Sequence, residues 1–286
     1  MRLLDHVTRC NSFDPADYCP FLVAGHSVGA LRPALADRLG DFPAVFRTTA
    51  QGIHLAETLT TAEARTEAMA EIARPLTAAG ILPPPLGELY RVVRRWGDTP
   101  LLLLDRAFVP FFGITAFGVH VNGYVDDGRG LRLWVAERSA DRRVEPGKLD
   151  NVVAGGQPAG LGLMDNLVKE AFEEAGMPRD LALQARPAGA VSYCMATPDG
   201  LKPDVMFVYD IALPADFRPV NTDGEVGRFH LMEPAEILAI LTSGQRFKFN
   251  VPLVLIDFFI RHGILSADTE PDYHDLVHGL RATGRV

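Results

Sequence analysis

Three glutamates near the middle of the chain constrain its fold more than any other feature. Glu170, Glu173 and Glu174 stand at i, i+3 and i+4, so a helix would place all three on one face, with Cβ atoms about 5–6 Å apart. The surrounding pattern predicts such a helix over residues 163–175, with Gly176 and Pro178 ending it. Carboxylates this close repel one another, and at least one pKa rises unless a positive charge lies among them.

A hard divalent cation such as Mg²⁺ or Mn²⁺ would relieve that repulsion, since it prefers carboxylate and carbonyl oxygens. The pair Gly155-Gly156 precedes the helix, and without side chains its backbone can approach the same ion. The alternative is a solvated acidic helix face, which is what such a run usually means. The glycine pair ahead of the helix and the Ala-Gly at its end favour a metal site.

The segment KEAFEEAGM (169–177) resembles the second half of the signature of Nudix (MutT-like) hydrolases, Gly-x5-Glu-x7-Arg-Glu-U-x-Glu-Glu-x-Gly-U, where U is aliphatic. Lys169 stands in place of the usual Arg, and Leu161 in place of the first Glu. The Gly-Gly turn also lies one residue nearer the helix than in the usual signature. Lysine keeps the charge of arginine but loses its bidentate contact with a carboxylate. The metal-facing glutamates are all present, so the resemblance implies an active hydrolase.

The resemblance extends over nearly the whole chain. The segments FGVHVNGY (117–124), WVAERS (134–139) and PGKLDN (146–151) look like one subgroup, the Nudix portion of fungal thiamine pyrophosphokinase proteins and related plant and bacterial Nudix enzymes. That subgroup implies thiamine diphosphate, or its oxidised analogues, cut to the monophosphate. Hydrolysis of a nucleoside-diphosphate sugar or of ADP-ribose is the alternative.

The resemblance also assigns roles to residues. Nudix hydrolases direct water onto a phosphorus of a diphosphate, while Mg²⁺ neutralises the developing charge. The implied metal ligands are Gly155 (through its carbonyl), Glu170, Glu173, Glu174 and Glu225, the last within NTDGEV (221–226). Glu170 and Glu225 are the candidate catalytic bases, and the sequence leaves open which of them acts.

Four further residues are candidates for substrate binding. Arg138 and Lys148 flank the loop that leads to the glycine pair, and their charges suit phosphate contacts. His120 and Asn122 alternate on an expected strand, so they share a face that could line the substrate cleft. A surface role for the two cations, and a structural role for the histidine, stay open.

The expected elements interleave strands and helices, so the fold class is α/β or α+β. The family resemblance implies a Nudix α/β/α sandwich with a mixed sheet over residues 111–286. A smaller N-terminal α/β domain of unknown role precedes it over residues 1–110. Expected strands lie at 116–125, 131–137, 188–195, 204–213 and 227–232, with helices starting at 234 and 251 and a loop over 138–160.

Within the N-terminal domain, the capping box Thr60-Thr61-Ala62-Glu63 predicts a helix that breaks near Pro75. The spacing of Leu86, Leu89, Tyr90 and Val93 predicts a second helix ending at Gly97. A buried strand follows at 101–104.

Composition narrows the partners and the compartment. The formal net charge of −8 argues against sequence-independent nucleic-acid binding, which needs cations to neutralise phosphates. The most apolar stretch, 251–260, contains Asp257 and is far shorter than the ~20 residues of a membrane span. The cysteines are Cys10, Cys19 and Cys194, an odd count without a CxxC pair, so a reducing, cytoplasmic setting is expected. The expected partner is a small diphosphate substrate, and a homodimer stays open.

Two rival functions remain. Gly25-His26-Ser27-Val28-Gly29 matches the nucleophile elbow of serine hydrolases, but only 24 residues precede it, too few for the strands that such an elbow follows. A turn before a helix starting near Ala30 is the preferred interpretation. The second rival is a non-catalytic Nudix-fold module that binds a metabolite, which Leu161 and Lys169 keep open.

Overall fold

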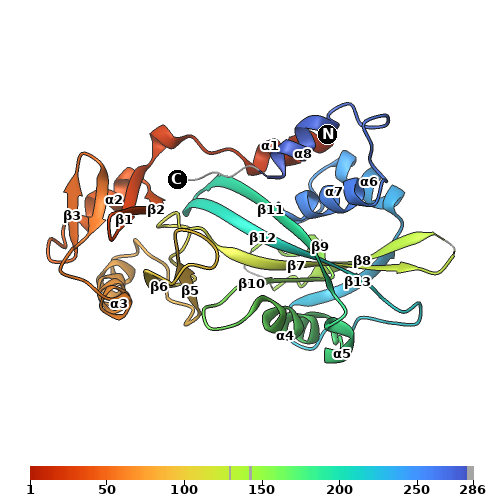
Figure 1. The fold of residues 1–286 in the computed structure, drawn as a ribbon, viewed down its shortest axis with the longest axis horizontal. Coiled ribbons are helices and arrows are strands. Elements are labelled where there is room, and N and C mark those ends of the chain that lie inside the picture. The colour runs from red at the N-terminus through yellow and green to blue at the C-terminus, as the bar shows by residue number, and fades with distance from the viewer. Residues whose placement is uncertain (129, 142–143, 282–286) are drawn as a thin grey trace.

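A computed structural model describes residues 1–128, 130–141 and 144–281 of the chain. Figure 1 shows a smaller body of short strands and helices beside a larger body built around a long sheet. Both bodies contribute residues to the wall of one cavity.

The smaller body holds a sheet of order β2-β1-β4-β3 and a two-stranded hairpin. Its strands are β1 Cys19–Val23, β2 His26–Leu31, β3 Phe46–Thr49, β4 Gly52–Leu55, β5 Leu89–Val92 and β6 Leu102–Asp105. Its helices are α2 Pro33–Leu39 and α3 Ala62–Ala78, and a 3₁₀ turn, Pro15–Asp17, precedes β1. The apolar side chains of these elements form one core, which includes Phe21, Met69 and Phe112.

The helix predicted over residues 86–97 is wrong, because this stretch contains strand β5. Tyr90 and Val92 are buried whereas Leu89 is exposed, and Tyr90 pairs with Leu104 of β6. Over so few residues, helical spacing and strand alternation fit the same apolar positions. The strand forms because it pairs with β6, and the spacing of nearby residues does not reveal that pairing.

Two other expectations in this body are corrected. Helix α3 continues through Pro75 to Ala78, and its buried Leu76 supplies packing that offsets the hydrogen bond lost at proline. Residue 30, expected near the start of a helix, lies in β2, where the Ala30 amide donates to the Phe112 carbonyl at 3.0 Å.

The larger body is built on a seven-stranded sheet with the path β11-β12-β7-β8-β13; β10 pairs with β7 and β9 with β8. The strands are β7 Phe117–Asp126, β8 Leu131–Arg138, β9 Leu149–Asn151, β10 Val153–Gly156, β11 Arg186–Thr197, β12 Gly200–Ala212 and β13 Val226–Met232. β7 and β12 are parallel, whereas β7 and β8 are antiparallel. The expected mixed sheet is therefore confirmed.

Helices cover both faces of this sheet (Figure 1). One face carries α4 Leu163–Ala175 and α5 Arg179–Ala182, packed over a core that includes Val119 and Leu167. The other carries α6 Pro234–Ser243, α7 Val251–Arg261 and α8 Tyr273–Gly279, over a core that includes Leu133 and Phe258. This layering confirms the α/β/α sandwich.

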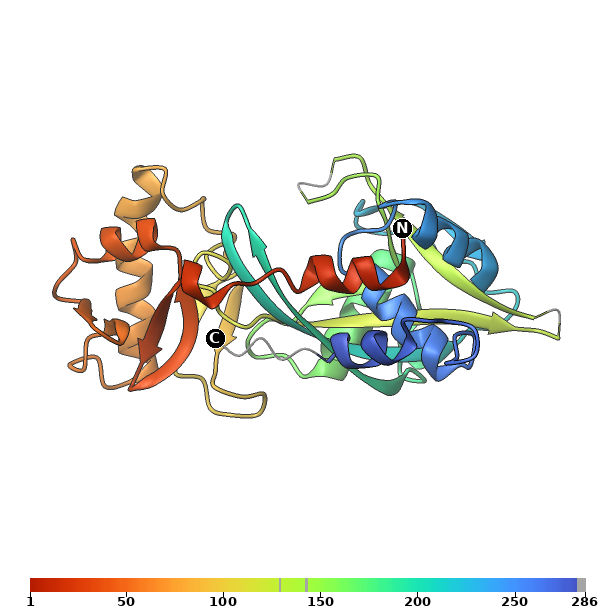
Figure 2. The same ribbon diagram turned by 90° about the horizontal axis from the view of Figure 1, so that it is seen from above.

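The first helix, α1 Leu3–Cys10, does not pack in the smaller body. Leu3 and Val7 belong to the same core as Phe258 of α7, and Figure 2 shows α1 lying along the larger body beside the C-terminal helices. The expected N-terminal domain, residues 1–110, therefore includes α1, although α1 packs against the larger body.

The segment leading to the site differs from the expected loop. Residues 138–160 contain β9 and β10, and in β10 Gly155 pairs with Val119 while Gly156 pairs with Gly118. Strands this short and rich in glycine show too little alternation to be recognised from sequence. The next helix, α4, has the predicted bounds and ends at Gly176 with φ +60°, the left-handed conformation that favours glycine.

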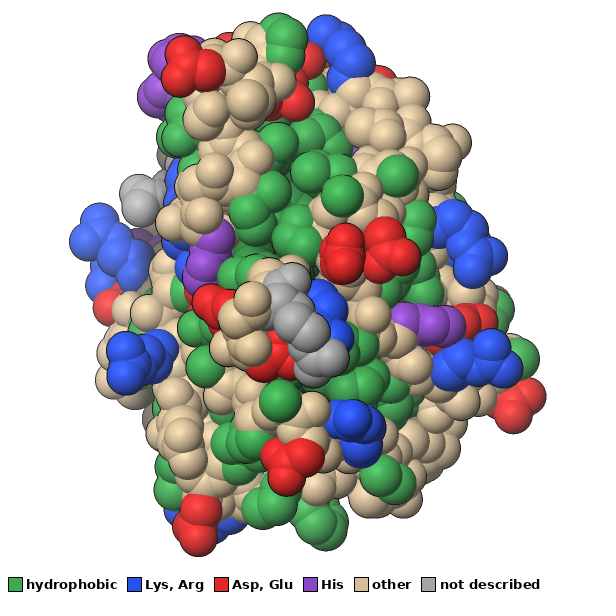
Figure 3. Space-filling model, turned by 90° about the vertical axis from the view of Figure 1, so that its right-hand side faces the viewer, with side chains coloured by type: hydrophobic (Ala, Val, Ile, Leu, Met, Phe, Trp, Pro, Cys, Tyr) green, Lys and Arg blue, Asp and Glu red, His purple; other side chains and the backbone are tan. Residues whose placement is uncertain are grey.

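The surface carries charges of both signs. On the end of the molecule seen in Figure 3, Lys and Arg side chains are interspersed with Asp and Glu. Within the described residues, no helix combines the length and the apolar character that crossing a bilayer would need. The three cysteines are free thiols, two of them buried; the expected reducing, cytoplasmic setting stays a prediction.

Candidate active site

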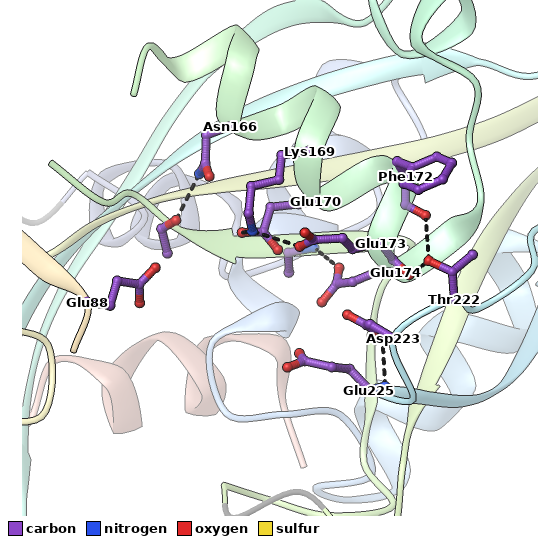
Figure 4. Close-up of polar contacts among 12 residues, drawn as sticks. Glu88, Asn166, Lys169, Glu170, Phe172, Glu173, Glu174, Thr222, Asp223 and Glu225 are labelled. Atoms are coloured by element: carbon purple, nitrogen blue, oxygen red, sulfur yellow. Dashed lines mark hydrogen bonds and ion pairs between the residues drawn. The ribbon is translucent and has the colours of Figure 1, made fainter. Parts of the chain in front are cut away.

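The three glutamates of helix α4 differ in how far their side chains are exposed to solvent. Glu174 is buried, and its Oε2 accepts a hydrogen bond of 2.7 Å from the Ala154 amide of β10. The Glu170 side chain is 15% exposed and that of Glu173 38% exposed. Lys169 Nζ lies 2.7 Å from Glu173 Oε2 and 3.3 Å from Glu170 Oε1 (Figure 4). The lysine that replaces the family's arginine therefore still pairs with the carboxylates.

Strand β10 lies directly against this helix face. A Cβ atom at Gly155 would lie 2.7 Å from Glu170 Oε1, so only glycine allows the strand and the carboxylate to be this close. The Gly156 carbonyl accepts a 2.8 Å hydrogen bond from Asn166 Nδ2 of α4, which fixes the strand on the helix. The glycine pair thus lets β10 pack closely against the acidic helix, and its expected approach to a metal ion stays a prediction.

The glutamates lie in surroundings that disfavour their charges. Burial raises the pKa of Glu174 well above its ordinary value, and the charges of Asp150 and Glu170 raise it further. Burial also raises the pKa of Glu170; Lys169 opposes that rise, whereas Glu173 and Glu225 reinforce it. The site therefore has an excess of negative charge that a cation would neutralise.

Glu225 approaches from the segment before β13. Thr222 anchors this segment, because its amide donates to the Glu173 carbonyl at 3.0 Å, and the Glu225 amide donates to Asp223 Oδ1 at 2.8 Å. In Figure 4 the Glu225 side chain extends from this segment toward the glutamates of α4. The residues predicted as metal ligands thus lie on three neighbouring segments: Gly155 on β10, Glu170, Glu173 and Glu174 on α4, and Glu225 before β13.

The donor chemistry of this group fits a hard divalent cation: carboxylate oxygens and a nearby backbone carbonyl. As the side chains lie, no three His, Cys, Asp or Glu residues in the described part of the chain are close enough to hold a metal together. The Lys169 ammonium occupies the position between Glu170 and Glu173 instead. The residues therefore match a metal in kind and charge, and binding requires their carboxylates to converge.

A cavity of about 260 Å³ adjoins the site and is lined by both bodies. Gly155 and Gly156 form part of its wall, while Tyr90 and Arg106 come from the smaller body. A Cβ at Gly156 would lie 2.9 Å from Tyr90 Cζ and closer still to the hydroxyl. Gly155 lines the cavity and also lies against Glu170 of the acidic helix, so it contacts both.

Of the four predicted substrate-binding residues, two line the cavity. His120 is buried, and its Nδ1 donates to Asn151 Oδ1 at 2.9 Å; burial, with Lys248 nearby, lowers its pKa to about 4. Arg138 forms a buried ion pair with Asp150 at 2.9 Å. Both are thus held by neighbours while facing the cavity.

The other two do not belong to the cavity wall. Asn122 is buried, accepting from Asn151 Nδ2 and donating to Asp210 Oδ1, both at 3.0 Å. The Lys148 ammonium binds the Gln245 carbonyl. As these side chains lie, Asn122 orients the histidine through Asn151, and Lys148 ties β9 to the loop before α7. Substrate contact for either residue stays a prediction.

Sequence reasoning missed the residues that the smaller body adds. Arg106 pairs with Glu88 at 2.8 Å and lies 6.0 Å from the Tyr90 ring centroid. It also missed Tyr193, Asp204 and Asn250, which line the cavity from β11, β12 and the start of α7. Asp204 directly precedes the apolar run VMFV (205–208) of β12, which was an available signal, since a carboxylate beside a buried run needs a reason to be there.

The serine-hydrolase motif has no corresponding site. Gly25 lies in the turn between β1 and β2, and Ser27 is an exposed residue of β2 that pairs with Leu22. A nucleophile elbow joins a strand to a helix, and this hairpin does not. Cys194 is buried beside Ala30 and Leu201, as expected for a core residue.

An α/β/α sandwich with an acidic helix behind a Gly-Gly strand is the architecture expected of a Nudix hydrolase, and comparison with known proteins agrees. The chain is 38% identical to "Nudix hydrolase 24, chloroplastic" of Arabidopsis thaliana over 97% of its own length and 77% of that protein. "Nudix hydrolase 20, chloroplastic" of the same plant is also 38% identical, with the same coverage of both chains. This chain belongs to the Nudix hydrolase family and is a hydrolase.

The N-terminal part of the chain, which comprises α1 and the smaller body, matches a separate family model. Residues 2–116 match a domain of unknown function, DUF4743. Among solved structures, the MutT protein of Methanosarcina mazei Go1 is similar with a TM-score of 0.40 and 18% identity, over 52% of this chain and 95% of that one.

Proposed function

We propose that this Nudix hydrolase cleaves the phosphoanhydride of a diphosphate-linked metabolite and depends on Mg²⁺ or Mn²⁺. The observation that carries the proposal is the position of Gly155, which lies against Glu170 and also lines the cavity. A diphosphate at this strand would have the acidic helix on one side and room for its organic group on the other.

The chemistry of each side chain assigns it a role in the proposed reaction. Glu170, Glu173, Glu174, Glu225 and the Gly155 carbonyl would hold the metal, which supplies charge neutralisation at the phosphates when bound. Glu170 and Glu225 are the carboxylates that could accept the proton of the attacking water. Arg138 and Arg106 line the cavity, and their guanidinium groups suit the phosphate oxygens.

For the substrate, we propose thiamine diphosphate or its oxidised analogues, converted to the monophosphate. The support is the subgroup resemblance of segments 117–124, 134–139 and 146–151. A nucleoside-diphosphate sugar and ADP-ribose are the competing substrates, because a diphosphate between two organic groups meets the same requirement.

The test is turnover of a substrate panel with Mg²⁺, with Mn²⁺ and with EDTA. The panel holds thiamine, oxythiamine and oxothiamine diphosphates beside ADP-ribose and a nucleotide sugar. Metal-dependent turnover of a thiamine compound supports the whole proposal, and turnover of a nucleotide alone replaces the substrate. Binding of a panel member without hydrolysis under any metal would instead indicate a metabolite-binding module.

A further inference from the structure

A chain of hydrogen bonds leads from the cavity wall to a carboxylate beside α7. It begins at His120, whose Nδ1 lies 2.9 Å from Asn151 Oδ1. Asn151 Nδ2 donates to Asn122 Oδ1 at 3.0 Å, and Asn122 Nδ2 donates to Asp210 Oδ1, also at 3.0 Å. Asp210 lies opposite Asn122 across β12 and β7. These four residues form a polar relay, and all but Asp210 are buried.

The carboxylate of Asp210 sets the direction of the relay. Arg261 of α7 donates to both of its oxygens, and His262 Nε2 lies 3.2 Å from Oδ2. Burial alone would raise the pKa of Asp210, but hydrogen bonds from Arg261 and Asn122 hold it below its ordinary value. Asp210 is therefore ionised and can only accept hydrogen bonds.

An obligate acceptor at one end leaves each amide a single orientation. Asn122 turns its Nδ2 toward Asp210, so its Oδ1 accepts from Asn151. Asn151 then presents its own Oδ1 to His120, and because this oxygen can only accept, the histidine proton lies on Nδ1. Burial lowers the pKa of His120 to about 4, so near neutral pH its Nε2 carries no proton and has a free lone pair.

This second nitrogen of His120 is open to the cavity. Nε2 has no hydrogen-bond partner within the described residues, and it is not among the fully buried polar atoms that lack one. His120 lines the cavity together with Ala154 and Gly155, and it pairs with Ala154 across β7 and β10. An accessible acceptor therefore lies at the wall along which the diphosphate is proposed to bind.

We propose that His120 accepts a hydrogen bond from an N–H or O–H group of the substrate through Nε2, and that Asp210 is a positioning residue for it. Acting through the two asparagines, the carboxylate holds the histidine in the tautomer that leaves Nε2 free. In the other tautomer Nε2 would carry the proton and would face the substrate as a donor. The inference rests on the proposed function only in taking the hydrogen-bond donor to belong to the diphosphate substrate.

The first test reads the tautomer by ¹⁵N NMR of the full chain labelled at histidine. Protonated and unprotonated ring nitrogens differ in chemical shift, and the His120 signals are identified by their loss in His120→Asn. Near pH 7 we expect a protonated Nδ1 and an unprotonated Nε2 in the wild type. Asp210→Asn replaces the obligate acceptor with an amide that can also donate, so part of the population should carry the proton on Nε2.

Two further variants separate this effect from a loss of stability. Asn122→Leu interrupts the relay but keeps the Asp210–Arg261 ion pair, so it should shift the tautomer even if Asp210→Asn fails to fold. Asp257→Asn removes the other carboxylate that pairs with Arg261, at 2.7 Å, and lies outside the relay. It is the matched control and should keep the wild-type tautomer. Urea unfolding of each variant gives its stability.

The second test asks whether a ligand uses Nε2. Each compound of the substrate panel is added to the labelled wild type in EDTA and to labelled Glu174→Gln in Mg²⁺, so the readout does not depend on hydrolysis. We expect at least one compound to move the Nε2 signal while Nδ1 stays protonated. Its affinity, measured by calorimetry, should fall about tenfold in Asn122→Leu, as for loss of one hydrogen bond.

The outcomes keep this inference apart from the proposed function. A protonated Nε2 in the wild type, an unchanged tautomer in Asn122→Leu, the same shift in Asp257→Asn, or an Nε2 signal that no compound moves would overturn it. Metal-dependent hydrolysis alongside any of these results would leave the proposed function standing. The expected tautomer and ligand response without any turnover would support this inference and count against the proposed hydrolysis.

Discussion

Gly155 of β10 lies so close to Glu170 of α4 that a Cβ atom on the glycine would lie 2.7 Å from Glu170 Oε1. The strand that lines the cavity and the helix that carries the acidic residues therefore meet without any intervening side chain. If a diphosphate binds along β10 as proposed, this contact would set how near it can come to the glutamates.

Gly155→Ala should leave the protein folded and impair catalysis. The methyl group would displace the far end of the Glu170 side chain rather than backbone, since the atoms that it meets belong to that side chain. We expect kcat to fall by about a hundredfold, because small displacements of a catalytic group cost about that much. Steady-state kinetics and circular dichroism check this. A wild-type kcat would show that the position of Glu170 is not critical.

Glu174→Gln should separate folding from catalysis. Glutamine keeps an acceptor for the Ala154 amide at this buried position and removes a charge that burial disfavours. Stability to urea should therefore be unchanged or higher, while kcat should fall by about two orders of magnitude or more with loss of a metal-ligating charge. Glu71→Gln, on the exposed surface of α3, is the control. Wild-type turnover in Glu174→Gln would remove Glu174 from the metal site.

Arg106→Gln tests whether the smaller body takes part in binding. Arg106 lines the cavity and pairs with Glu88, so its loss should raise KM for the diphosphate about tenfold, as expected for a charge-assisted hydrogen bond. Arg47→Gln breaks an exposed ion pair with Glu57 in the same body and should leave KM unchanged. Equal KM values for the two variants would contradict a role for Arg106 in substrate binding.

The buried His120 predicts a pH dependence of stability. Its folded-state pKa is about 4, below the ordinary 6.5, so the unfolded chain binds the proton more readily between these values. His120 therefore imposes no penalty above pH 6.5 and a growing one as the pH falls toward 4, up to about 3 kcal/mol.

The measurement is urea unfolding of the wild type and of His120→Asn between pH 4 and 7.5. Asparagine keeps a donor for Asn151 and cannot take up the proton, so the variant should lose less stability than the wild type on acidification. His26→Asn, in the exposed β1–β2 hairpin, should follow the wild type. Parallel curves for the wild type and His120→Asn would rule out the histidine as a source of acid sensitivity.

The sequence predicted those features that depend on residues close together in the chain, and it failed where distant segments decide the structure. Helix α4 has its predicted bounds, because the stop at Gly176 and the acidic face are local features. Strand β5 was predicted as a helix, because only β6, ten residues further on, decides its conformation. The glutamates of α4 and Gly155 could be predicted because they lie within about twenty residues of one another in the sequence and form one recognisable motif.

The rest of the site comes from segments whose proximity only the fold creates. Tyr90 and Arg106 come from the smaller body, and Asp204 and Asn250 from β12 and the start of α7. No spacing in the sequence joins them, and an isolated arginine or asparagine has many ordinary structural uses. Asn122 and His120 were correctly placed on one face of β7, but alternation could not tell which of the two would reach the cavity.

The packing of α1 against the last helices has a consequence for how the molecule is made. His6 donates to the Leu241 carbonyl at 2.9 Å across a separation of 235 residues, and Leu3 and Val7 share a core with α7 and α8. During synthesis the smaller body can form once its own residues have emerged, whereas α1 is made well before α7 and α8, against which it packs. Until those helices emerge, the apolar face of α1 stays uncovered and can take part in aggregation.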